Sequence, residues 1–256
     1  MNIKSKFYVV LGASLLALGL VAGSSANASV VIAGTRVIYN APEHETTLKI
    51  SNKGQEPALI QAWVDNGEAN AEPSEIDVPF TVTPPLARLD PQKSQTLRIF
   101  YTGEALPKNK ESVFWLNVLE VPPRPAADKE DKNHLQLAIR SRIKLFFRPA
   151  DLKGDAAHTP GSITWRLIRD AGGSALEAHN PSVFHASFAS LEVGSGGKTA
   201  TFEEGGMLAP GETRSFPLKG QVSSGIDAKV HYRAINDYGG ITEGDASLIS
   251  TPSQAK

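Results

Sequence analysis

From residue 29 onward, the chain is made of short hydrophobic segments separated by turn-forming residues. Thr47-Leu48-Lys49-Ile50 alternates polar and apolar positions, as a half-buried strand does, and Asn52-Lys53-Gly54 is typical of a turn. No long segment has a helical period. In the first half, the pattern predicts strands over residues 30–39, 45–51, 58–64, 80–82, 94–101, 113–121 and 134–147.

The second half repeats this pattern more weakly, with glycine and serine frequent between the hydrophobic segments. Its clearest predicted strands cover residues 161–169, 185–193, 213–218 and 229–236. Seven strands in about 120 residues are expected of an immunoglobulin-like sandwich. Residues 149–159, punctuated by Gly154 and followed by Pro160, are typical of a linker. We therefore expect an all-β chain with two immunoglobulin-like β-sandwich domains, over residues 29–150 and 151–256.

Residues 1–28 have the pattern of a signal peptide that directs export. Lys4 and Lys6 give a positive start, an apolar stretch follows over residues 7–22, and Ala26-Asn27-Ala28 fits a small-x-small cleavage site. The alternative is a membrane anchor, but the apolar stretch is short and interrupted by glycines. We expect cleavage after Ala28, an exported chain, and no membrane insertion after cleavage.

The composition excludes several kinds of chemistry. The chain has no cysteine, so it can form neither a disulfide nor a thiolate metal site. Its formal net charge is −1, which does not favour nucleic-acid binding. The histidines show no metal-ligand spacing, and we expect no metal or cofactor. The stretch from Gly194 to Thr199 is similar to the end of a phosphate-binding loop, but Glu192 replaces the required glycine, so a hairpin is predicted.

One predicted strand is unusually long. Residues 134–148 run for about fifteen residues without a strand breaker, which at ~3.3 Å per residue approaches ~50 Å. Strands usually have about 3–10 residues. A long apolar strand at the end of a domain is expected at a sheet edge, where it promotes aggregation unless it is covered or used. The alternative is a strand that simply continues into the linker.

Motifs along the whole exported chain resemble those of the periplasmic pilus chaperones, the PapD-like family. The motifs of the first domain are Gly34-Thr35-Arg36-Val37-Ile38-Tyr39, Ile60-Gln61-Ala62-Trp63-Val64, Thr83-Pro84-Pro85-Leu86-Ala87-Arg88-Leu89, Glu111-Ser112-Val113-Phe114-Trp115-Leu116-Asn117, Val121-Pro122-Pro123-Arg124 and Ile143-Lys144-Leu145-Phe146-Phe147-Arg148-Pro149. The second domain contributes Ile235-Asn236-Asp237-Tyr238-Gly239-Gly240. The short loop over residues 122–133 and the absence of cysteines resemble the short-loop subgroup, which serves rod-type pili.

The resemblance implies a function without enzymatic activity. It implies two sandwiches in an L or boomerang arrangement, with a cleft that receives a pilus or fimbrial subunit. Subunits in that family are incomplete sandwiches, and the chaperone lends them the last strand of its first domain, a form of strand addition at a sheet edge. The chaperone folds and caps the subunit in the Gram-negative periplasm and delivers it to an outer-membrane usher. On this basis residues 134–148 are the lent strand.

The resemblance also assigns subunit-binding residues. Arg36 and Lys144 match the cations that bind the subunit's C-terminal carboxylate, a role that suits a guanidinium and an ammonium; the alternative is a solvated face. Leu135, Leu137 and Ile139 match the residues that enter the subunit groove; the alternative is ordinary core. Lys144 has the opposite parity to these three, so a regular strand would place it on the opposite face. Twist, a bulge or the exit of the strand into the cleft could reconcile the two roles.

Two further groups match structural features of the family. Glu111, Arg148 and Asp237 match a charged network between the domains that fixes the interdomain angle. Pro122 and Pro123 match a proline segment on the usher-binding face, with a strand terminator as the alternative.

Two other functions stay open at this stage. A secreted β-sandwich adhesin or structural pilus component would share the fold but would not need a paired Arg and Lys near the domain junction. A secreted hydrolase on a β-sandwich would need a catalytic site, and the sequence shows no pattern for one.

Overall fold

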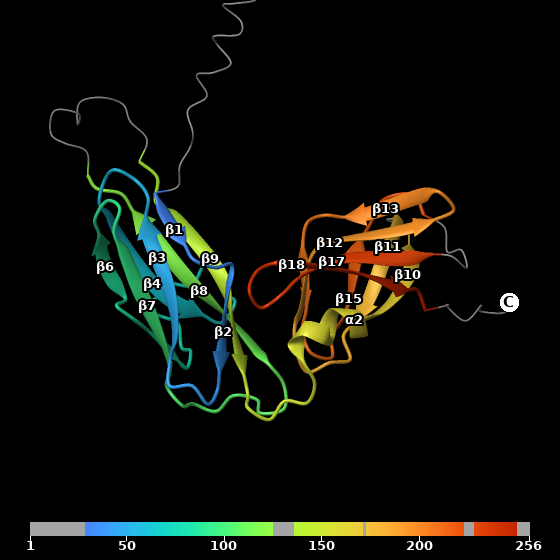
Figure 1. The fold of residues 1–256 in the computed structure, drawn as a ribbon, viewed down its shortest axis with the longest axis horizontal. Helices are drawn as coiled ribbons and strands as arrows, with labels where there is room; N and C mark the ends of the chain where they lie inside the picture. Colours follow the sequence, from blue (N-terminus) through green and yellow to red (C-terminus); the bar gives the residue numbers. More distant parts are fainter. Residues whose placement is uncertain (1–28, 125–135, 171–172, 223–227, 250–256) are drawn as a thin grey trace, which may run out of the picture.

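The computed structural model describes residues 29–124, 136–170, 173–222 and 228–249. These residues form two β-sandwiches joined by a short segment after β9 (Figure 1). The prediction of an all-β chain with two sandwich domains is confirmed. The strands of the first domain are β1 (Val30–Ile32), β2 (Arg36–Asn40), β3 (Thr46–Asn52), β4 (Ala58–Asp65), β5 (Phe80–Thr83), β6 (Leu86–Leu89), β7 (Ser94–Tyr101), β8 (Ser112–Val121) and β9 (Ile139–Arg148).

Two sheets enclose the core of the first domain. One has the strand order β1-β3-β7-β5, and the other has the order β2-β9-β8-β4-β6. Alternate residues of each strand point inward, as the buried Leu48 and Ile50 of β3 and the buried Phe114 and Leu116 of β8 show. An aromatic cluster of Tyr39, Phe80, Tyr101, Phe114 and Phe147 fills the end nearest the second domain. The second sheet therefore has a packed inner face and an outer face that is free to carry function.

The predicted strand over residues 30–39 is wrong in one respect, because it is two strands in different sheets. β1 pairs with β3 in the first sheet, whereas β2 pairs with β9 in the second. The chain crosses between the sheets at Ala33-Gly34-Thr35. A Cβ added to Gly34 would lie 3.4 Å from the Arg36 carbonyl oxygen and 3.7 Å from Leu48 Cδ1, so the crossing passes close to both strands. The crossing closes one edge of the sandwich and brings Arg36 beside β9.

The long strand predicted over residues 134–148 is shorter in the structure. β9 begins at Ile139, and residues 136–138 precede it without strand pairing, while residues 134 and 135 lie outside the described residues. β8 pairs with β9 from Ile139 to Phe147, whereas β2 pairs with it only from Lys144 to Arg148. The outer edge of β9 from Ile139 to Ile143 is therefore unpaired among the described residues. The prediction of an edge strand is correct for this half of β9.

The second domain is also a sandwich of two sheets. Its elements are η2 (Ala156–His158), α2 (Thr159–Ser162), β10 (Thr164–Asp170), β11 (Gly173–His179), β12 (Ala186–Ser195), β13 (Lys198–Phe202), β14 (Gly206–Leu208), β15 (Thr213–Pro217), β16 (Lys219–Gly220), β17 (Lys229–Ile235) and β18 (Ile241–Ser247). One sheet has the order β10-β11-β15, and the other β16-β13-β12-β17-β18, with β14 also on β12. The predicted hairpin after Gly194 is confirmed, since β12 and β13 pair across Gly196-Gly197.

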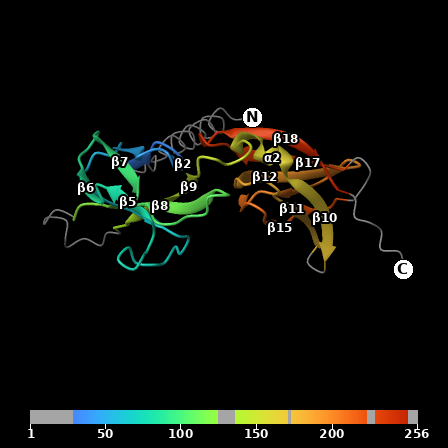
Figure 2. The same cartoon turned by 90° about the horizontal axis from the view of Figure 1, so that it is seen from below.

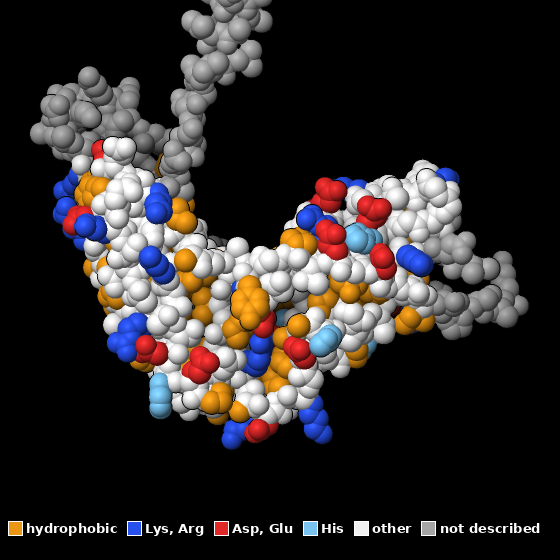
Figure 3. Space-filling view, in the orientation of Figure 1, with side chains coloured by type: hydrophobic (Ala, Val, Ile, Leu, Met, Phe, Trp, Pro, Cys, Tyr) orange, Lys and Arg blue, Asp and Glu red, His pale blue; other side chains and the backbone are white. Residues whose placement is uncertain are grey.

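The two domains meet at an angle in Figure 1 and lie one beside the other in Figure 2, and the space-filling view shows a hollow between them (Figure 3). The turn between β17 and β18 points toward β2 and β9 of the first domain (Figure 1). The segment that precedes β8 also contacts the second domain: the Glu111 N–H donates a hydrogen bond to the Val183 carbonyl at 2.9 Å. This arrangement matches the expected boomerang. In the described part of the chain, no helix is long and apolar enough to cross a membrane.

Candidate functional site

Arg36 and Lys144 lie side by side where the first domain faces the second. They are register partners in the parallel pairing of β2 with β9, so both side chains leave the same face of the sheet. That face is the outer one, because Val37 and Leu145, the next residues on each strand, are buried in the core. The predicted pair of cations is therefore brought together by the fold, from segments more than one hundred positions apart in the sequence.

Lys144 stands in a partly desolvated, positively charged environment. Its Nζ lies 5.7 Å from the centre of the Trp115 ring on β8. Burial and the nearby charge of Arg36 lower the pKa of Lys144 to about 8. A site that disfavours the ammonium ion in the free protein would gain from an anion placed between the two cations.

Arg142 lies beside Trp115 at this site and is held by the buried carboxylate of Asp65. Its guanidinium lies 4.2 Å from the centre of the Trp115 ring, and its Nε donates to Asp65 Oδ2 at 3.0 Å. Asp65 also accepts hydrogen bonds from Asn117 Nδ2 at 2.7 Å and from the Gly67 N–H at 2.7 Å. Burial raises the pKa of Asp65, but these hydrogen bonds outweigh it and lower the pKa overall. The Trp115 ring thus has both cations, Arg142 and Lys144, near it.

Arg36 connects the two domains directly. Its Nη1 donates to the Ile235 carbonyl of β17 at 3.0 Å, and its guanidinium lies 5.6 Å from the centre of the Phe146 ring. Burial lowers the pKa of Arg36, while the negative charges of Asp237 and Glu111 oppose this shift. Arg36 lines an interdomain cavity of about 340 Å³. In the space-filling view, basic, acidic and hydrophobic side chains meet at the bottom of the hollow between the domains (Figure 3).

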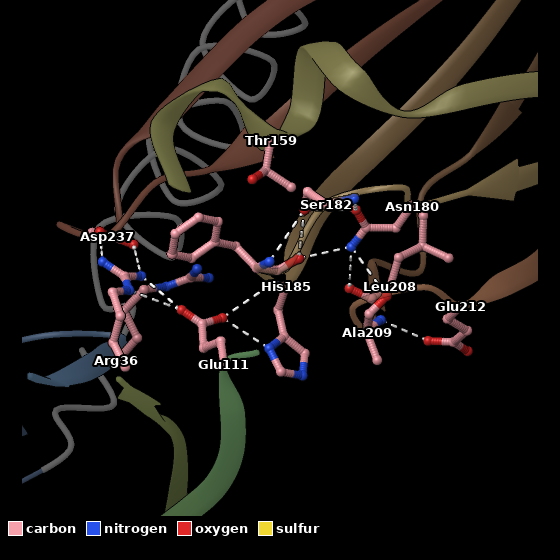
Figure 4. A network of polar contacts seen from close by, with 12 residues as sticks. Arg36, Glu111, Thr159, Asn180, Ser182, His185, Leu208, Ala209, Glu212 and Asp237 are labelled. Atoms are coloured by element: carbon pink, nitrogen blue, oxygen red, sulfur yellow. Dashed lines mark hydrogen bonds and ion pairs between the residues drawn. The ribbon is translucent and has the colours of Figure 1, made fainter. Parts of the chain in front are cut away.

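A charged network lines this cavity and joins the domains (Figure 4). Arg148 donates to Glu111 Oε2 from Nε at 3.0 Å and from Nη2 at 2.8 Å, and its Nη1 donates to Asp237 Oδ2 at 2.8 Å. Burial lowers the pKa of Arg148, but the hydrogen bonds and charges of Asp237 and Glu111 raise it overall. The structure therefore brings all three predicted network residues together.

The network includes a fourth residue that sequence reasoning missed. His185, at the start of the second domain's large sheet, meets Glu111 Oε1 with both its backbone N–H at 2.9 Å and its ring Nδ1 at 2.8 Å. The Glu111 carboxylate thus accepts from two residues of different domains. The His185 ring also packs near an aromatic residue, because its centre lies 5.4 Å from the centre of the Phe146 ring. No spacing motif marks this histidine in the sequence.

Replacing Glu111 with glutamine should destabilise the protein strongly. The Glu111 side chain is only 2% exposed, and glutamine would remove its charge and replace one of its two acceptor oxygens with an NH2 group that faces Arg148 or the His185 N–H. Breaking a buried charge pair typically costs about 3–5 kcal/mol. Asp237→Asn should cost less, because Asp237 is 38% exposed. Urea unfolding measures both free energies.

The matched control for that experiment is Glu204→Gln. Glu204 pairs with Lys219 on the surface, where such a pair contributes about 0–1 kcal/mol. A Glu111→Gln variant no less stable than Glu204→Gln would contradict the buried network.

Of the residues predicted to enter a subunit groove, Ile139 begins β9 at its unpaired edge, and Leu137 lies in the segment that precedes the strand. Leu137 is 62% exposed and Ile139 is 48% exposed, so neither is ordinary core. Leu135 lies outside the described residues. The β8–β9 register has no bulge, so Ile139 and Lys144 are on opposite faces of β9. Ile139 is opposite Glu120, which reaches inward to the Val30 N–H of β1. Ile139 therefore lies on the face of the sheet that carries the buried Leu145, whereas Arg36 and Lys144 lie on its outer face.

The proline segment is held against the chain that leads into β9. Strand β8 ends at Val121, and Gln136 Nε2 donates to the carbonyls of Pro122 at 3.2 Å and Pro123 at 2.8 Å. The prolines do end a strand, in agreement with the alternative reading, and they also contact the segment that precedes β9. No group of three or more potential metal ligands occurs among the described residues.

Comparisons with known proteins agree with this geometry. The N-terminal domain model of the PapD pili and flagellar-assembly chaperones matches residues 29–153, and the C-terminal domain model of the PapD pili assembly chaperones matches residues 158–246. The chaperone protein FimB/FhaD of Bordetella pertussis is 48% identical over 93% of this chain and 94% of its own length.

Solved structures show the same similarity. The crystal structure of the chaperone YadV has a TM-score of 0.74 and 40% identity, and covers 86% of this chain and 100% of its own. A probable fimbrial chaperone of that name in Escherichia coli strain K12 is 44% identical over 88% of this chain and 92% of its own length. The SafB chaperone of Salmonella enterica, solved in complex with the SafA pilin, has a TM-score of 0.71 and 29% identity over 88% of this chain and 99% of its own. The chain belongs to the PapD family of pilus-assembly chaperones.

Proposed function

We propose that this chain captures pilus subunits by adding the unpaired edge of β9 to an incomplete subunit sandwich. One observation carries the proposal: the free edge of β9 from Ile139 to Ile143 ends at Lys144, where two cations stand side by side. An added strand would pair its backbone along the edge, and its terminal carboxylate would lie between Arg36 and Lys144. The complex of the related SafB chaperone with a pilin supports a subunit as the ligand.

The apolar residues and the cations along β9 have different roles in capture. Leu137 and Ile139 offer exposed apolar side chains that a groove between two sheets can bury, each burial contributing about 1.5–3 kcal/mol. Arg36 and Lys144 on the opposite face hold the carboxylate, which fixes the register of the added strand. The two roles need no bulge, because a strand added at the edge is within reach of both faces.

We further propose the cellular setting and the partner that receives the subunit. The pattern of residues 1–28 supports export to the periplasm with cleavage after Ala28. The exported chain then consists of the domains over residues 29–150 and 151–256. Pro122 and Pro123, held by Gln136, would couple the start of β9 to the surface that meets an outer-membrane usher. Glu111, Arg148, Asp237 and His185 set the angle between the domains and hence the width of the cleft.

Purification of the tagged chain from its own periplasm tests the proposed function. The expected result is a one-to-one complex with a smaller protein that is itself a pilus component. A secreted adhesin or structural pilus component would instead be recovered in polymers or attached to the cell surface. Recovery of the chain in such polymers, without a one-to-one complex, would contradict the proposal.

Subunit capture should weaken as the pH rises above about 8. The pKa of Lys144 in the free protein is about 8, and a carboxylate bound beside it raises that pKa. Below pH 8 Lys144 is already protonated before the subunit binds, whereas above pH 8 it must take up a proton when the subunit binds, which weakens capture. Affinity should therefore be constant well below pH 8 and fall as the pH rises through it. The affinity of purified chain for its subunit, measured from pH 6 to pH 9.5, gives this profile.

The control for the pH profile is Lys144→Arg. An arginine stays charged across this range, so the profile should become flat whatever the affinity of the variant. An equally steep decline in Lys144→Arg would assign the pH dependence to another group.

A further inference from the structure

Tyr238 is an aromatic residue displayed almost entirely to solvent. It lies in the turn between β17 and β18, and 96% of its surface is exposed. The other large hydrophobic residues with high exposure in the described ranges are between 42% and 62% exposed. The ring thus contributes little to the stability of the free protein, although it lines the same cavity as Arg36.

The turn that carries Tyr238 is rigid. Asn236 Oδ1 accepts hydrogen bonds from the N–H groups of Tyr238 and Gly240, both at 3.0 Å. The Asn236 and Gly240 backbones pair at 2.9 Å, and Gly239 has a φ of +81°, which favours glycine. The backbone from which the ring projects is therefore already ordered before a partner binds, so only the side chain loses freedom on binding.

The turn is also fixed relative to the carboxylate site. Asp237 pairs with Arg148, and Ile235 accepts a hydrogen bond from Arg36. Gly239 lies so close to Thr35 that a Cβ on it would clash with Thr35 Oγ1. Thr35 directly precedes Arg36, so Tyr238 is held next to Arg36 by contacts on both sides of the turn.

We propose that Tyr238 packs against the last residues of the captured subunit and prefers an apolar or aromatic side chain close to the C-terminal carboxylate. The inference rests on the proposed function, which places that carboxylate at Arg36 and Lys144. The end of the added strand then lies at the end of β9 that faces the second domain, within the cavity that Tyr238 lines. Tyrosine is among the residues most enriched at interface hot spots, because it buries a large aromatic surface and keeps a polar group.

Photo-crosslinking tests this placement. p-Benzoylphenylalanine at position 238 should crosslink to a segment within about five residues of the subunit's C-terminus, as read by mass spectrometry of the purified complex. The matched control is the same probe at Ile249, which is 47% exposed in the same domain and should not reach that segment. A crosslink only to another part of the subunit, to the usher or to a second copy of this chain, or none at all in a complex that forms, overturns the inference.

Dissociation kinetics give a second, independent test. Tyr238→Ala should leave the melting temperature of the free chain unchanged and raise the rate of subunit dissociation about 10-fold, while Tyr238→Phe should stay near wild type. In the subunit, alanine at the apolar positions next to the C-terminus should cause the same loss, with no further loss when combined with Tyr238→Ala. Unchanged dissociation in Tyr238→Ala overturns the inference.

These results are distinct from a failure of the proposed function. If Arg36→Ala abolishes capture and Tyr238→Ala does not weaken it, only the role of Tyr238 is wrong. If the wild-type chain forms no subunit complex, the proposed function fails, and the role of Tyr238 fails with it.

Discussion

The Arg36→Ala and Lys144→Ala variants should remain folded and soluble but should no longer capture a subunit. Each charge-assisted hydrogen bond to a carboxylate contributes about 1.5–3 kcal/mol, so capture should weaken by on the order of 100-fold or more when the bidentate Arg36 contact is lost and by about 10-fold or more when the Lys144 contact is lost. Folding should change little, because burial opposes the charge of both residues in the free protein, as their lowered pKa values indicate. Subunit recovery from the periplasm and thermal unfolding of the purified variants measure the two effects.

The control for these variants is Arg88→Ala. The Arg88 side chain, on β6, is 71% exposed and pairs with Asp90, which follows that strand, away from the cleft. It should support capture as well as wild type. The carboxylate site is contradicted if Arg36→Ala and Lys144→Ala protect subunits as well as Arg88→Ala does.

Leu137→Glu and Ile139→Glu should also abolish capture, for a different reason. Each would place a charge in the apolar groove of the subunit, where a desolvated carboxylate has no partner. Both side chains are exposed in the free chain, so the free protein should fold normally. Subunit recovery and the melting temperature of the free variants measure the two consequences separately.

The matched control here is Ile249→Glu, at a side chain of similar exposure in the second domain. Gln136 is a poorer control, although it has the opposite parity, because its amide donates to the carbonyls of the proline segment and a glutamate could not. Capture that survives Leu137→Glu and Ile139→Glu as well as it survives Ile249→Glu would show that β9 is not the donated strand.

The sequence predicted the strands whose residues alternate most clearly. β3 and β7 were predicted within a residue or two, because Leu48 and Ile50 alternate with polar residues and turn-forming residues flank both strands. β6 was missed because it has only four residues directly after two prolines. The division of residues 30–39 into β1 and β2 was missed because hydrophobicity continues through the crossing, and only Gly34 marks it.

The site was predicted in part, and mostly through the resemblance. Arg36 and Lys144 are ordinary cations in their local sequence, and only the parallel pairing of β2 with β9 brings them together. His185 and the Asp65–Arg142 pair were missed because their contacts join residues 74 and 77 positions apart, which no local pattern records. The start of β9 was predicted too early, because the apolar alternation continues through Leu137, where the structure shows no strand partner.

Amide hydrogen exchange of β9, with and without bound subunit, tests strand donation most directly. From Ile139 to Ile143, the amides that face β8 should be protected in both states, because β8 pairs with this whole segment. The amides that face the open edge should exchange rapidly in the free chain and become protected in the complex. If those edge amides still exchange rapidly in a stable subunit complex, while another part of the chain gains protection, the subunit is not held by β9.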